Sequence, residues 1–158
     1  MDLEIHHIDR GHAVALFGPV LIRVITTAPT DLPSLDQLQQ LTELALRRWP
    51  MAGVWVVAHH GAPFPDSDFR RHVGPALRPV RDRLAMVVTP LGLGFWSKAA
   101  VLMTFTLGKM VGNVPTVETT VERGAVRLGF ELIGVDAEKL VASHTALLEG
   151  IQAAAKVA

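Results

Sequence analysis

The chain has 158 residues, 49% of them hydrophobic and 19% charged, so it has the size of one domain and enough apolar surface to form a core. Its 15 basic side chains balance 15 acidic ones, which removes any overall electrostatic reason to expect nucleic acid or an anionic membrane as partner. The absence of cysteine excludes disulfides, thiolate zinc sites and cysteine nucleophiles. The first residues do not read as a secretory signal, so a cytoplasmic location is expected.

Three short strands are predicted at the N-terminal end. Residues 3–8, 12–17 and 20–26 are rich in β-branched side chains, and turn signals at 9–11 and 18–19 separate them. Such closely spaced strands indicate an antiparallel meander.

A helix and a buried strand are predicted next. Leucine, alanine and tryptophan recur at helical spacing from Leu35 to Trp49, and Ser34 with Gln37 matches a capping box. Residues 53–60 form a continuous apolar run, which is typical of a central strand covered on both faces. We expect this strand to pair with another at 83–89.

A second helical stripe links those two strands. It starts after Asp66, its expected N-cap, and Pro75 and Pro79 must kink or break it. Basic side chains gather here, and they suit either a phosphate-binding or acidic-partner patch or a solvated helix face: Arg70, Arg71, Arg78, Arg81 and Arg83.

The most hydrophobic stretch is GLGFWSKAAVLMTFTLGKMVG, residues 92–112. Lys98 and the preceding glycines and Pro90 interrupt it, so no apolar run reaches the roughly 20 residues of a membrane span. We predict a loop and then a helix from about Phe95 to Val111, ended by Gly112. Because this helix is apolar nearly all round, both of its faces should be covered, one by the sheet and one by a partner.

A short strand follows, and then two helices complete the chain. Thr119 with Glu122 predicts the start of a helix that runs to Ile133, and Asp136 is expected to cap the last helix, with His144 on its apolar face. The predicted fold is therefore a single α/β domain over residues 1–158, a mixed sheet whose N-terminal antiparallel strands precede alternating helices and strands.

This order of elements resembles the STAS fold of bacterial anti-sigma-factor antagonists and of the cytoplasmic domains of sulfate transporters. The segments GLGFWSKAA and VPTVETTVERGAVRLGFELIG, with the helix after Asp136, resemble uncharacterised bacterial proteins of that fold. The resemblance implies a regulatory or scaffolding domain without catalysis. It also implies a phosphorylated serine after the third main strand, for which Ser67 is the nearest candidate. Its neighbours Asp66 and Asp68 would repel a phosphate, and the alternative is that Ser67 or Asp66 only caps a helix.

A ligand site is predicted where a parallel strand ends. His59 and His60 lie at that end, and a glycine-containing loop and the N-terminus of the apolar helix follow the next strand. Backbone amides there can hold an anion, although GLG alone is a common loop sequence. The candidate ligand-binding residues are His59, His60, Gly92, Gly94, Trp96, Ser97 and Lys98.

The histidines also raise the question of a metal. His6, His7 and His12 can approach His59 and His60 within one sheet, but adjacent strand residues point to opposite faces, so each pair offers one ligand to a given side. With no HExxH spacing we predict neither a metal nor a cofactor.

The functional expectation is a non-catalytic regulatory or scaffolding domain that binds a protein partner, either another protein or a second copy of itself as a homo-oligomer. Val101, Phe105 and Leu107 are the candidate interface residues. The alternative is a small-molecule or lipid-binding module with its pocket near residues 92–98. The sequence contains no nucleophile-elbow motif, and we predict no enzyme, nucleic-acid partner or membrane span.

Overall fold

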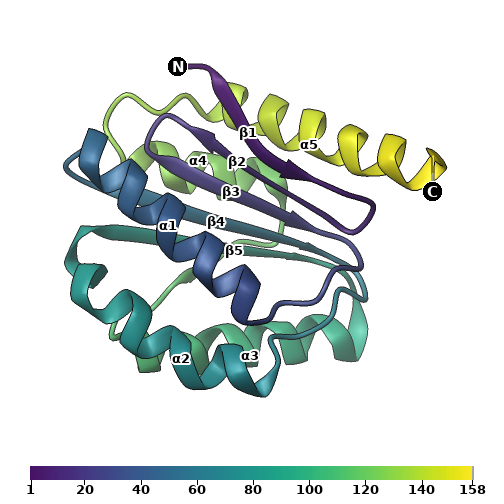
Figure 1. Ribbon diagram of the computed structural model, residues 1–158, viewed down its shortest axis with the longest axis horizontal. Coiled ribbons are helices and arrows are strands. Elements are labelled where there is room, and N and C mark those ends of the chain that lie inside the picture. The colour runs from purple at the N-terminus through teal and green to yellow at the C-terminus, as the bar shows by residue number, and fades with distance from the viewer. Residues whose placement is uncertain (158) are drawn as a thin grey trace.

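The computed structural model describes residues 1–157 and is built on a six-stranded sheet with the strands side by side in chain order (Figure 1). The strands are β1 (Leu3–Ile8), β2 (His12–Phe17), β3 (Val20–Ile25), β4 (Ala52–His59), β5 (Leu84–Leu91) and β6 (Thr116–Val117). The helices are α1 (Leu32–Arg48), α2 (Ser67–Leu77), the 3-10 helix η1 (Arg78–Arg83), α3 (Gly94–Val111), α4 (Val121–Glu131) and α5 (Ala137–Val157).

The strand directions confirm the predicted α/β class. β1, β2 and β3 form an antiparallel meander, whereas β3 to β6 run parallel. The crossovers through α1, α2 and α3 place these three helices on one face of the sheet, and α4 and α5 cover the other (Figure 1). The chain is thus a three-layer arrangement with a separate apolar core on each side of the sheet.

The face under α4 and α5 is closely packed. Trp55 and Leu128 are fully buried there, and the Trp55 indole donates a hydrogen bond of 3.0 Å to Thr89 Oγ1. A Cβ on Gly124 would lie 2.7 Å from each of these two polar atoms, so only glycine lets α4 approach the sheet so closely.

Polar groups at the helix ends explain where most helices begin. Asp66 caps α2 through Phe69 N, as predicted, and Asp136 Oδ1 accepts from Lys139 N at the start of α5. The predicted capping box at Ser34 is wrong, because α1 begins three residues earlier than a Ser34 cap would place it. Asp31 is the N-cap, and its carboxylate accepts from Ser34 N.

The prolines act as predicted in the segment that follows β4. α2 contains Pro75 but ends at Leu77, and the chain continues as the 3-10 helix η1, which includes Pro79. β5 runs two residues beyond its predicted end and includes Pro90. This is tolerated because β6 reaches only to the level of Val88, so Pro90 has a strand neighbour on one side alone.

α3 has the predicted extent, and Gly112 ends it in the left-handed conformation with φ of 81°. The side of α3 for which a partner was expected is exposed in this single chain: Phe95 is 88% exposed, Leu102 69% and Phe105 40%. Across residues 1–157, none of the helices is both long enough and apolar enough to cross a membrane.

Candidate functional site

An apolar cavity of about 160 Å³ lies between the sheet and the helices α1, α2 and α3. Its floor is the inner face of the central strands, where the parallel register puts Arg23, Val56 and Val88 in one row. The next row toward the strand ends is Ile25, Ala58 and Pro90. Val56 and Val88 stay partly exposed in the middle of the sheet because they face this space.

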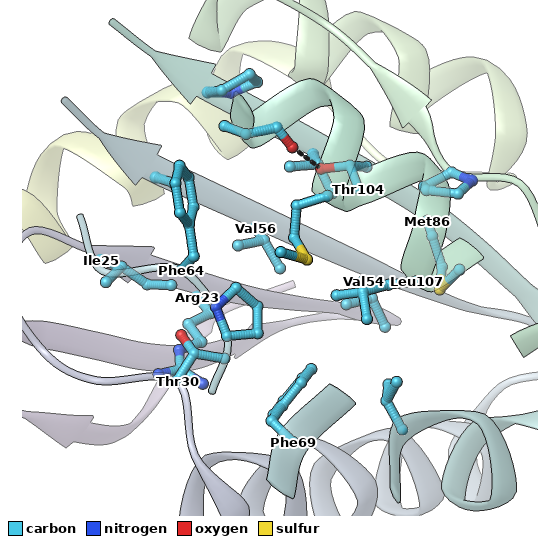
Figure 2. A pocket seen from close by; sticks show the side chains of 18 of the residues that line it. Arg23, Ile25, Thr30, Val54, Val56, Phe64, Phe69, Met86, Thr104 and Leu107 are labelled. Carbon is cyan, nitrogen blue, oxygen red and sulfur yellow. Dashed lines mark hydrogen bonds between the residues drawn. The ribbon is translucent and has the colours of Figure 1, made fainter. Parts of the chain in front are cut away.

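The roof of the cavity comes from α2 and α3. α2 packs beside α1 and α3, and its buried side chains belong to the same apolar core as Val54 and Leu84 of the sheet. Phe69 on α2 and Thr104 and Leu107 on α3 reach over the floor (Figure 2). The small floor side chains do not fill the gap, which leaves the cavity.

The rim of the cavity contains two aromatic rings from different segments. Phe64, in the loop before α2, is 39% exposed, and its ring lies 6.1 Å from that of Trp96 with an angle of 14° between the planes. Trp96 Nε1 donates to the Ala62 carbonyl at 3.1 Å, and His60 packs against the indole at 5.3 Å. Both Phe64 and Trp96 line the cavity.

Arg23 is the charged residue of the lining. Its side chain is 5% exposed, and Nη2 donates to the Pro29 carbonyl at 3.1 Å and to Ser34 Oγ at 3.0 Å. Its Nε is enclosed and has no hydrogen-bond acceptor. Burial lowers the pKa of Arg23 to about 10, with Asp31 and Asp9 acting in the opposite direction, so the group keeps its charge at neutral pH.

The predicted ligand-binding residues divide between the two sides of the sheet. Trp96 lines the cavity. His60 and Gly92 lie against the Trp96 ring, since a Cβ on Gly92 would meet the His60 and Trp96 rings. Gly94, Ser97 and Lys98 start α3 but are not part of the lining.

His59 points to the opposite face, as the alternation of a strand requires, and meets His144 of α5. The two Nε2 atoms are 3.4 Å apart, and the rings stack with centroids 5.7 Å apart. Burial lowers the pKa of both rings, that of His144 to about 4 with a further contribution from His59. They therefore form a neutral pair in the closed core, in which one Nε2 donates to the other.

Two of the histidines considered as metal ligands, His7 and His12, form a cluster with Asp9. His7, Asp9 and His12 each place a ligand atom within 4.8 Å of the others, while His6 lies beside Glu4 and the His59 pair lies elsewhere. Asp9 Oδ1 accepts from Gly11 N and His12 N, and Asp9 Oδ2 lies 2.8 Å from His7 Nε2. Burial alone would raise the pKa of Asp9, but these hydrogen bonds outweigh it and hold that pKa well below its usual range.

Such a histidine and carboxylate set can bind a divalent transition metal in chemical terms. The hydrogen bonds within the set also explain its geometry, because they stabilise the turn between β1 and β2. The cluster by itself therefore indicates no function.

The remaining candidates lie apart from the cavity or on its roof. Ser67 is exposed at the first position of α2, directly after the Asp66 cap. Of the interface candidates, Phe105 is exposed, Val101 is half-buried and Leu107 faces the cavity. In the arginine cluster, Arg78 donates to the Met110 carbonyl, and Arg83 donates to the carbonyls of Leu46, Trp49 and Pro50. These two arginines therefore hold segments together.

Sequence reasoning missed Arg23 and Phe64. Arg23 is the one charge in the apolar run VLIRVIT, and a charge within a strand predicted to be buried was the available signal. Phe64 carried no such signal, because its role depends on a loop that brings it to Trp96.

Comparison of the chain with protein-family models, curated proteins and solved structures finds no match. The resemblance to the STAS fold stays a prediction, and the function is argued from the geometry alone.

Proposed function

We propose that this domain binds a small, largely apolar molecule in the cavity between β4, β5 and the helices α2 and α3. The observation that carries the proposal is the cavity itself, whose lining is almost wholly apolar and whose rim is aromatic. A closed cavity of about 150 Å³ with apolar walls is known to bind benzene, so a space of about 160 Å³ suits a group of roughly six carbon atoms. Small-molecule sites commonly combine such walls with few polar groups.

The location also favours this function. The lining of the cavity reaches the carboxyl ends of the parallel strands, the edge at which open α/β sheets place their ligands. It adjoins the loop before α3, near the site that the sequence predicted for a small-molecule or lipid-binding module.

A protein-interaction role is the second candidate, supported by a different surface. Phe95, Leu102 and Phe105 are exposed on the outer side of α3, opposite the cavity. This apolar surface suits a regulatory or scaffolding contact, either with another protein or with a second copy of the chain. The two functions are compatible, because α3 contributes one face to each.

The direct test is titration with two neutral probes, benzene and 1-hexanol, followed by amide chemical shifts in 1H–15N NMR. We expect shifts confined to residues around the cavity, together with a rise in melting temperature that grows with probe concentration. Val56→Phe should fill the space and abolish both effects.

Val126→Phe is the matched control, because Val126 is 47% exposed on α4 and lies away from the cavity. It should leave binding unchanged. Shifts that spread evenly over the surface, or binding that survives in Val56→Phe, would refute the proposal.

A further inference from the structure

Arg23 presents an unusual electrostatic situation. The residue is only 5% exposed, yet no ion pair within 4.0 Å joins it to a carboxylate among residues 1–157. The carboxylate of Asp31 is linked to Arg23 only through a serine. Ser34 Oγ accepts a hydrogen bond from Arg23 Nη2 and donates one of 2.9 Å to Asp31 Oδ1. Buried charges are normally paired and fully hydrogen-bonded, and here Nε has no acceptor.

Arg23 is also part of the cavity lining. The residue sits in the floor row beside Val56, and its neighbour at that end of the cavity is Thr30, which is 7% exposed (Figure 2). Away from this end the lining is apolar except for Thr104, whose hydroxyl donates to the Ala100 carbonyl at 2.8 Å within α3. The cavity therefore has one cationic end with a hydroxyl group, and otherwise an apolar body.

We infer that the ligand is a small carboxylic acid, bound as its anion with the carboxylate at Arg23 and Thr30 and the hydrocarbon part between α2 and α3. The carboxylate would accept from Nη1, because Nη2 already donates twice and Nε is enclosed, and from the Thr30 hydroxyl. A hydrogen bond in which both donor and acceptor are charged is stronger than a neutral one, so a single contact of this kind favours a carboxylate. This inference rests on the proposed function and specifies its ligand class.

The charge of Arg23 and the volume of the cavity limit which anionic ligands fit. Arg23 offers one positive charge, and Asp31 and Asp9 already act on it, so a phosphate dianion would bring an uncompensated negative charge into an apolar site. The volume of about 160 Å³ accommodates about six carbon atoms, as in hexanoate or benzoate, but not a long acyl chain.

The test compares isosteres on the unaltered protein. Dissociation constants for hexanoate and benzoate are measured by calorimetry at pH 7 beside those for 1-hexanol and benzyl alcohol. We expect each anion to bind about ten- to one-hundred-fold more tightly than its neutral partner, the range for a hydrogen bond to a charged group. In the same titration, the 1H–15N resonance of the Arg23 Nε–H group should move with the carboxylates and much less with the alcohols.

Two variants separate charge from structure. Arg23→Met should reduce hexanoate affinity to that of hexanol, but it removes the contacts to Pro29 and Ser34 and can unfold the region. Thr30→Val keeps the shape and removes only the hydroxyl. It should weaken hexanoate about three- to tenfold and leave hexanol unchanged.

The outcomes are distinct. If the alcohols bind as tightly as the anions, or if the Arg23 resonance does not move, the carboxylate inference fails while the apolar-ligand function stands. If neither anion nor alcohol binds, both fail. Tighter anion binding with a shifted Arg23 resonance supports both.

Discussion

The two faces of the sheet are covered by helices to different degrees. Val57 and Val56 are neighbours on β4, but Val57 is fully buried under α4 and α5, whereas Val56 stays partly exposed toward the cavity. The difference comes from the helices, since Gly124 lets α4 come into contact with Trp55, while the side chains of α2 and α3 leave a space above Val56 and Val88. One face has the packing density of a core, and the other keeps a space at the cost of some stability.

The contrast between the two faces is tested most directly by replacing one leucine on each face with alanine and comparing the losses of stability. Leu128→Ala should lower the free energy of unfolding by about 3 kcal/mol or more, because Leu128 is fully buried between α4 and the sheet. Leu107→Ala should cost about 1 kcal/mol, since its side chain already borders open space. Urea denaturation followed by circular dichroism measures both, and equal losses would contradict the contrast.

The closed face should also make the protein sensitive to acid. The pKa of His144 is about 4 in the folded chain against 6.5 for an unperturbed histidine, so the unfolded state binds the proton first as pH falls. Stability is therefore fully present above pH 6.5 and declines down to about pH 4, by about 3 kcal/mol for a shift of this size. His59, whose pKa is lowered in the same direction, adds to the loss.

Denaturant unfolding at a series of pH values checks this expectation. His144→Gln should flatten the curve between pH 6.5 and 4, while His72→Gln, at an exposed position of α2, should leave it unchanged. A wild-type curve that is already flat in that range would show that the pair is not held neutral.

The smallest effect is expected from adding volume. Val57→Phe should destabilise the protein by about 1–3 kcal/mol, because the closed core has no room for the ring. Val56→Phe should be neutral or slightly stabilising, since the ring enters the cavity. Melting temperatures of the two variants provide the measurement, and a larger loss in Val56→Phe would mean that the cavity is not available space.

The sequence predicted the fold well because its signals are local. The meander, the end of α3 at Gly112 and the cap at Asp136 follow from residues within a few positions of one another, whereas the pairing of β4 with β5 was expected from two apolar runs separated along the chain. The start of α1 was misplaced because Asp31 and Ser34 are both good cap residues, and only the backbone decides between them.

The candidate site could be predicted only in part. Trp96 and His60 were identified from their place after parallel strands, and this edge of the sheet does border the cavity. A pocket near residues 92–98 was predicted as an alternative, but the cavity along β4 and β5 was not, because an apolar run such as VWVVA has the same pattern whether its side chains meet a helix or an empty space. It depends on how α1, α2 and α3 together cover the sheet.

The rim of the cavity gives the protein a built-in optical reporter. The protein has three tryptophans. Trp55 is buried in the closed core, and Trp49 directly follows α1 and is not part of the cavity lining. Of the three, Trp96 alone lines the cavity, and it stacks on Phe64. A ligand entering beside the indole changes the polarity around Trp96 only. The emission of this unlabelled protein can thus follow occupancy in real time, with the other two indoles as an internal reference.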